Sequence, residues 1–122
     1  MIPFLSPVRE WLLSDTQYYE VVWSVYTTIE SERNNILTST LRATREQLQG
    51  LPPTLLQTSE LNVLRDEGEA FGRKLDEAGV DVTVTRNNGL IHDYGLLNPR
   101  SNVPAVKTSL RQAAEELKTY LK

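Results

Sequence analysis

His92 is the single histidine of this 122-residue chain, and imidazole is the side chain best suited to proton transfer near neutral pH. A histidine that acts as a general base needs a hydroxyl group to activate and an acidic group to orient it. No serine of the chain lies in a Gly-x-Ser-x-Gly pentapeptide, the elbow that exposes a nucleophilic serine. We therefore nominate no nucleophile among the serines, which are Ser6, Ser14, Ser24, Ser31, Ser39, Ser59, Ser101 and Ser109. By spacing alone, a single histidine in a loop is more often a solvated side chain than a catalytic group.

The sequence predicts neither a metal site nor a cofactor site. One histidine, no cysteine and scattered carboxylates give no spacing typical of metal ligands. Gly68 and Gly72 fall inside a predicted helix and form no phosphate-binding loop, so close helix packing explains Gly72 and Ala70 better. Trp11 and Trp23 could line a pocket, but large aromatic rings among helical apolar residues are more often part of a core.

Composition indicates a one-domain globular protein, residues 1–122, with 24% charged and 39% hydrophobic residues. A net charge of −3 without a basic cluster argues against nucleic acid as a partner. No stretch approaches the roughly 20 apolar residues that cross a bilayer, so we expect no membrane partner. The lack of cysteine favours a cytoplasmic location, although cysteine-free chains occur in every compartment.

The first part of the chain, residues 1–50, predicts one strand and two helices. Residues 2–8 are apolar but contain two prolines, which restrict the strand to a short or edge position. Apolar residues spaced three and four apart predict an amphipathic helix from Tyr18 to about Arg33. A further short helix is expected around Thr44–Gln49.

Residues 51–122 predict two more strands that alternate with two helices. Residues 54–58 and the alternating residues 80–85 read as strands, and the latter is followed by a predicted turn at 87–89. Residues 66–78 read as a helix ended by a glycine, and a last helix begins at Pro104. The order indicates an α/β fold, a small three-stranded parallel sheet with flanking helices.

Two segments resemble a known family. Residues 58–68 read Thr-Ser-Glu-Leu-Asn-Val-Leu-Arg-Asp-Glu-Gly and residues 89–94 read Gly-Leu-Ile-His-Asp-Tyr. In this order and at this spacing they resemble the C-terminal half of an α/β-hydrolase of the hormone-sensitive-lipase-like esterase and lipase family. The resemblance implies that residues 1–50 are the first strand and lid-like helices, and that residues 51–122 are a C-terminal β-α-β-α unit.

By this resemblance His92 is the triad histidine and Asn62 occupies the position of the triad acid. Asparagine carries no charge to stabilise an imidazolium, and the same Asp-to-Asn change in a serine protease lowers turnover about 10⁴-fold. Glu60 shares a strand face with Asn62 if the strand extends that far, and Asp66 is also near in sequence, so these carboxylates are possible substitutes. Asp66 is explained equally well as a first-turn residue of a helix. The His-Gly-Gly run that builds the family's oxyanion hole is absent as well.

The resemblance also implies a surface that needs a partner. In the family the first strand of this segment pairs with the strand that carries the nucleophile. A chain without that strand exposes a sheet edge and apolar faces, which favour association. We therefore expect a homo-oligomer, or a partner chain that covers the edge.

The expected function is that of a truncated carboxylic-ester hydrolase, a pseudoenzyme that is inactive by itself. A first alternative is a split esterase, in which this chain supplies His92 to a partner chain that carries the serine. A second is a non-catalytic module that binds a small apolar ligand. The sequence does not identify a substrate.

Overall fold

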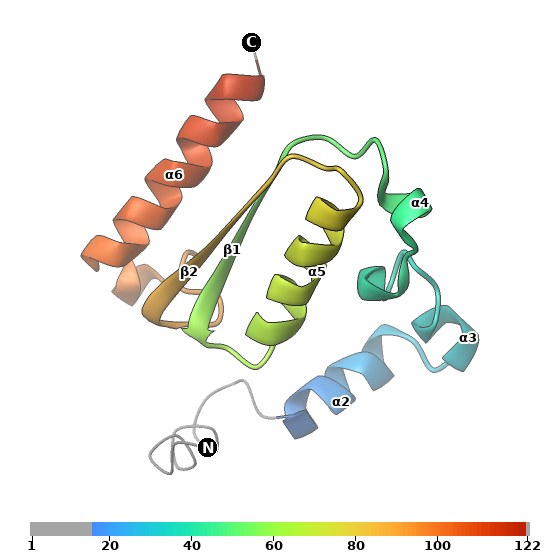
Figure 1. Cartoon of the computed structure of the whole chain (residues 1–122). Helices are drawn as coiled ribbons and strands as arrows, with labels where there is room; N and C mark the ends of the chain where they lie inside the picture. Colours follow the sequence, from blue (N-terminus) through green and yellow to red (C-terminus); the bar gives the residue numbers. More distant parts are fainter. Residues whose placement is uncertain (1–15, 122) are drawn as a thin grey trace, which may run out of the picture. The chain divides into compact units, whose positions relative to one another are not determined.

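The computed structural model describes residues 16–121, in two units whose described parts are residues 16–43 and 44–121 (Figure 1). The strand expected at residues 2–8 and the side chain of Trp11 lie outside the described residues. None of the described helices is long and apolar enough to cross a membrane.

The first unit contains α2 (Thr16–Tyr26), α3 (Glu30–Arg33) and the 3-10 helix η2 (Thr40–Arg42). The prediction of one helix from 18 to 33 is therefore wrong, because the helix stops at Tyr26. The Thr27 hydroxyl group accepts from Ile29 N at 3.1 Å and donates to the Glu32 carboxylate, while Arg33 donates to Thr27 O at 2.7 and 3.0 Å. Threonine side chains that bond to nearby groups in this way compete with the helical backbone, and consecutive β-branched residues weaken the helix further.

The second unit begins with the short helix α4 (Arg45–Leu48), as predicted around Thr44–Gln49. Thr44 and Gln47 form a reciprocal capping box, with Gln47 N donating to Thr44 Oγ1 at 3.3 Å and Thr44 N donating to Gln47 Oε1 at 2.9 Å. The remaining elements are β1 (Thr54–Leu61), α5 (Arg65–Glu77), β2 (Val82–Ile91), the 3-10 helix η3 (Asn98–Arg100) and α6 (Pro104–Tyr120).

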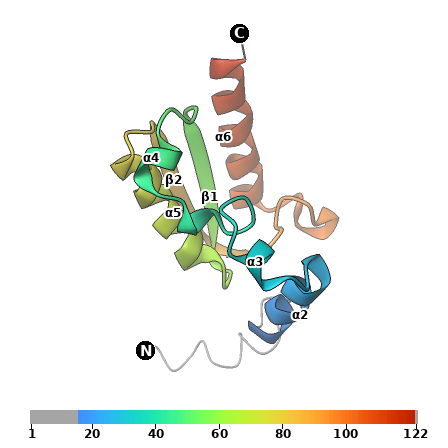
Figure 2. The same cartoon turned by 90° about the vertical axis from the view of Figure 1, so that its right-hand side faces the viewer.

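The sheet of the described residues consists of the parallel strands β1 and β2, with Thr54 opposite Val82. It therefore has two strands where three were expected, since the third was predicted in residues 2–8. Helix α5 covers one face and α6 the other, and Figure 2 shows the strands between these two helices. This α/β layering confirms the predicted fold class.

Strand β2 is longer than predicted, because the chain does not turn at residues 87–89. Instead a bulge interrupts the pairing: Ser59 lies opposite Asn87, but Leu61 lies opposite Ile91. Two steps along β1 (61 − 59) thus match four steps along β2 (91 − 87). Gly89 has φ of 73°, a left-handed conformation that glycine adopts without strain, and its amide donates to Glu60 Oε2 at 2.7 Å.

Helix α5 approaches the sheet closely at Gly72, as the sequence predicted. A Cβ atom at Gly72 would lie 2.4 Å from Val84 Cγ2 on β2. At Gly68, on the same helix, the nearest neighbour would be Thr58 Cγ2 at 3.3 Å. The core between the layers includes Leu75 and Val106, each only 1% exposed.

We predict that Gly72→Ala destabilises the protein although alanine is the better helix former. Overpacking against Val84 costs about 1–3 kcal/mol, and the gain in helix propensity returns about 1 kcal/mol. The net loss in the free energy of unfolding, up to about 2 kcal/mol, is measured by urea denaturation. Gly68→Ala is the matched control and should be less harmful.

A double-mutant cycle tests the cause of this loss. In a Val84→Ala background the Gly72→Ala change should be neutral or stabilising, because the obstructing methyl group has been removed. An equal loss in both backgrounds would contradict this explanation.

Candidate functional site

The two residues that the sequence singled out meet at the carboxyl end of the sheet. Asn62 directly follows Leu61, and His92 directly follows Ile91, the residue that lies opposite Leu61. Asn62 Nδ2 lies 3.1 Å from His92 Nδ1. The carboxyl ends of parallel strands are where α/β folds place their ligand sites.

The bulge in β2 is what brings these two residues together. Before the bulge, pairs differ by 28 residue numbers, as in Thr54 and Val82, and after it they differ by 30, as in Leu61 and Ile91. Without this shift Asn62 would lie opposite Leu90. Glu60 bonds to the bulge through Gly89, so its carboxylate stabilises the register that the site requires.

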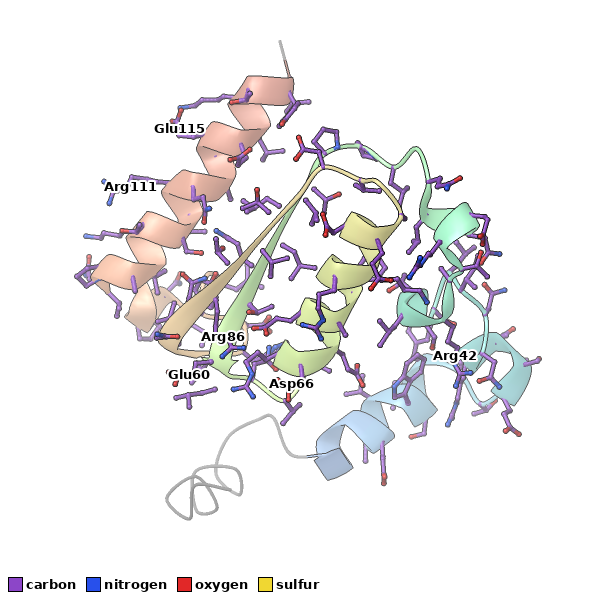
Figure 3. The ribbon with its side chains drawn as sticks, viewed as in Figure 1. Arg42, Glu60, Asp66, Arg86, Arg111 and Glu115 are labelled. Atoms are coloured by element: carbon purple, nitrogen blue, oxygen red, sulfur yellow. The ribbon has the colours of Figure 1, made fainter. Side chains whose placement is uncertain are left out.

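Both carboxylates that were considered as substitute acids accept hydrogen bonds from groups other than His92. Glu60 Oε2 accepts from Gly89 N at 2.7 Å, and Asp66 Oδ1 accepts from Arg65 Nε at 2.8 Å, in the first turn of α5. Figure 3 shows both side chains near the carboxyl end of β1. These contacts explain Glu60 as part of the bulge and Asp66 as a surface residue of the helix.

Asn62 is held at both ends of its side-chain amide. Its Oδ1 accepts from Leu64 N at 3.0 Å, and its Nδ2 contacts the imidazole of His92. The bond to the amide two residues ahead is the arrangement by which asparagine stabilises a turn. This turn connects β1 to α5 and fixes the Asn62 side chain toward β2.

The residue after His92 has an unusual backbone conformation. Asp93 has φ of 55°, in the left-handed region that costs energy for residues other than glycine, although aspartate tolerates it better than most. Leu96 N donates to Asp93 O at 2.9 Å and closes the turn. Asp93 Oδ2 lies 3.4 Å from His92 Nε2, so a carboxylate adjoins the second nitrogen of the ring.

A pocket of about 470 Å³ opens beside Asn62 and His92. The His92 side chain is 34% exposed, so solutes can reach it. Ser59 lines the same pocket but is only 3% exposed, which makes its hydroxyl group poorly accessible to a substrate. The apolar part of the lining consists of Leu56, Leu64, Leu96 and Leu110.

A partly buried polar network anchors the turn that carries His92 to helix α6. Tyr94 Oη lies 2.5 Å from Ser109 Oγ, and Asn87 Nδ2 donates to Tyr94 Oη at 3.2 Å. Gln57 Nε2 donates to Ser109 O at 2.9 Å and to Gln112 Oε1 at 3.0 Å. The sequence analysis missed this network; its signal is a set of polar residues at alternate strand positions, where a sheet covered by a helix usually places apolar ones.

A bidentate ion pair lies on the α5 side of the sheet. Arg86 donates from Nε and Nη2 to the two carboxylate oxygens of Glu69, at 2.7 and 2.6 Å. These bonds lower the pKa of Glu69 and raise the pKa of Arg86. Glu69 Oε1 also accepts from Thr58 Oγ1 at 3.2 Å, so its carboxylate joins α5 to both strands and supports the scaffold. The described residues contain no group of three His, Cys, Asp or Glu side chains that could hold a metal ion.

Comparison with known proteins identifies relatives that share this site region. The sequence pattern of the alpha/beta hydrolase fold matches residues 6–96. A thermostable esterase of Pseudomonas putida ECU1011 is 59% identical, with a TM-score of 0.86, over 88% of this chain and 34% of that chain. An esterase of Gibberella moniliformis is 33% identical over 99 residues, which are 79% of this chain and 31% of that protein.

One further similar structure is that of an esterase described as a homologue of a lipase. Brefeldin A esterase, a bacterial homologue of human hormone-sensitive lipase, is 32% identical with a TM-score of 0.64, over 70% of this chain and 25% of that chain. The present chain thus spans about a quarter to a third of the length of these relatives.

We predict that Glu60→Ala disturbs the site through the bulge. Loss of the bond to Gly89 removes about 1 kcal/mol of stability and loosens the register that places His92 beside Asn62. The measurement is the free energy of unfolding together with the NMR signals of the His92 ring and the Asn62 side-chain amide. Glu60→Gln retains an acceptor oxygen and should restore the wild-type signals. Unchanged His92 and Asn62 signals in Glu60→Ala would show that the bulge does not need this bond.

Proposed function

The chain belongs to the alpha/beta hydrolase fold family, among the hormone-sensitive-lipase-like esterases, and on this premise we propose that it is a carboxylesterase-like segment that hydrolyses no ester by itself. The family relationship supplies the reaction class, hydrolysis of a carboxylic ester. The residues at the site support the second half of the proposal, the lack of activity in the isolated chain.

The observation that carries the proposal is the contact between Asn62 and His92, in which Asn62 Nδ2 lies 3.1 Å from His92 Nδ1. In a hydrolase the group at this position must balance the positive charge that the histidine gains when it removes the serine proton. Asparagine is neutral, so the contact keeps the position of a triad acid but lacks its charge. The sequence also contains no nucleophile elbow, so none of its serines is presented to His92 in the way that the family presents its nucleophile.

A split esterase is the first alternative, and the access to His92 favours it. The ring borders a pocket of about 470 Å³ and is 34% exposed, so a serine from a partner chain could approach it. Asn62 argues against this alternative, because the reconstituted triad would still lack its acid. The same pocket, with its leucine lining, favours the second alternative, a module that binds a small apolar ligand without turnover.

We further propose that a second copy of this chain covers an edge of the sheet, and β1 offers such an edge in the part of the chain that the structure describes. Among the described residues β1 pairs with β2 alone, and the segment Thr54–Leu61 contains neither proline nor a basic residue that would discourage edge pairing. A two-stranded sheet gains stability from additional strands. If the β1 strands of two copies paired antiparallel, the edge N–H and C=O groups of both copies would be hydrogen-bonded in the same way.

Ester hydrolysis tests the main proposal. We expect purified protein and the His92→Ala variant to hydrolyse a short-chain p-nitrophenyl ester no faster than buffer does. Hydrolysis that disappears with His92 would contradict the proposal and would mean that a nucleophile operates in the chain. Hydrolysis that appears only after addition of a chain carrying the serine elbow, and that requires His92, would establish the split esterase.

Analytical ultracentrifugation tests the proposed dimer. We expect a dimer at micromolar concentration, with weak binding of a hydrophobic dye because the edge and the adjoining apolar side chains are covered. Leu55→Pro removes a backbone donor from the edge of β1 that faces away from β2, since Thr54 N bonds to Asp81 O, and should shift the protein toward monomer. A wild-type monomer that binds no dye would contradict the proposal.

A further inference from the structure

We infer that the backbone amide of Leu64 determines the protonated nitrogen of His92: it orients the Asn62 side chain so that the ring is held with its proton on Nε2. The inference deepens the proposed function, because it states how His92 faces the pocket. It applies to the neutral imidazole of His92. It is argued from which neighbouring atoms donate hydrogen bonds and which accept them.

The first step is the orientation of the Asn62 amide group. The oxygen and nitrogen of an asparagine side chain are distinguished by the groups that they contact. Leu64 N is a donor, and it lies 3.0 Å from the Asn62 atom assigned as Oδ1. The reverse orientation would place two donors against each other, so the Leu64 amide selects the orientation in which Nδ2 is directed at His92.

The second step is the tautomer of the ring. Asn62 Nδ2 carries only hydrogens to donate, so the His92 Nδ1 atom 3.1 Å away must accept with a lone pair. A neutral imidazole whose Nδ1 is unprotonated has its proton on Nε2. The contact therefore selects the Nε2–H form.

The contact at the other ring nitrogen, Nε2, favours the same tautomer. Asp93 Oδ2 lies 3.4 Å from Nε2, and a carboxylate attracts an N–H group rather than a lone pair. The turn that holds Asp93 in place is closed by the bond from Leu96 N to Asp93 O. Asn62 and Asp93 thus act in the same direction from opposite sides of the imidazole.

The consequence is that Nε2 of His92 is a hydrogen-bond donor, whereas the Nε2 atom of a general base is an acceptor. A general base must present the lone pair of Nε2 to the hydroxyl group that it activates, and an acid at position 62 secures this by accepting from Nδ1–H. In the present chain Nε2 carries the proton, so His92 offers a hydrogen-bond donor. An aspartate at position 62 could accept from Leu64 N and from Nδ1–H together, and would reverse the ring.

Nitrogen-15 NMR of the imidazole tests the inference on the intact chain. Because His92 is the only histidine, its two ring nitrogens give the only imidazole signals. At a pH where the ring is neutral, we expect Nδ1 to show a pyridine-type signal and Nε2 a pyrrole-type signal, with a scalar coupling across the hydrogen bond from Asn62 Nδ2 to Nδ1. In Asn62→Asp the two signal types should exchange nitrogens. A wild-type ring protonated on Nδ1, or an Asn62→Asp ring that stays protonated on Nε2, would overturn the inference.

An ester in place of the amide between Val63 and Leu64 isolates the role of that amide, because it removes the N–H donor and keeps every side chain. Proline would not serve, since Leu64 is the third residue of a turn closed by Arg65 N and Asn62 O, where proline also restricts Val63. Circular dichroism checks that the ester variant folds. We expect loss of the coupling and a mixture of tautomers, whereas the matched control Leu64→Ala keeps the amide and should match the wild type. A folded ester variant with the wild-type coupling would also overturn the inference. No substrate is involved, so this result is independent of the ester assay.

Discussion

The two-residue bulge in β2 is the constraint on which the site depends. Strand pairing fixes which residues leave the sheet side by side, and here the shift from an offset of 28 to one of 30 makes Asn62 and His92 neighbours. Since a shift of two residues preserves parity, the side chains of β2 beyond the bulge keep the same alternation between the two faces of the sheet. Glu60 and Gly89 are therefore as much a part of the site as the residues that line its pocket.

In the proposed function, Asn62 and His92 have the relative position of a triad acid and histidine, but Asn62 lacks the negative charge of the acid. Asn62 lies within hydrogen-bond distance of His92, and the turns on either side, held by Leu64 N and Leu96 N, fix the two residues. A neutral amide of nearly the same shape preserves these contacts, yet it supplies a donor where a base needs an acceptor. A fold can thus retain the position of its functional residues after their chemistry has been reversed.

Much of the second unit could be predicted from sequence because its signals are local. The short helix α4, the helix α5 and the proline at the start of α6 all lie where spacing and end signals placed them. The failures have tertiary causes: the Asn87-Asn88-Gly89 turn signal became a bulge, because Asn87 bonds to Thr58 O and Tyr94 Oη and keeps the chain in the sheet. The resemblance indicated Asn62 and His92, but the Leu64 amide leaves no mark in the sequence, since every residue except proline has one.

The anchoring of α6 explains how so small a sheet can hold a defined site. Two strands alone are marginal, and here helices cover both faces. On the α6 side the contact includes buried polar groups, and Ser109, 2% exposed, accepts from Gln57 through its carbonyl and meets Tyr94 through its hydroxyl group. Such bonds require one relative position of helix and strands, whereas apolar side chains tolerate sliding. Because Tyr94 lies two residues after His92, the same network that positions α6 also limits the movement of the imidazole, on which Asn62 and Asp93 then act.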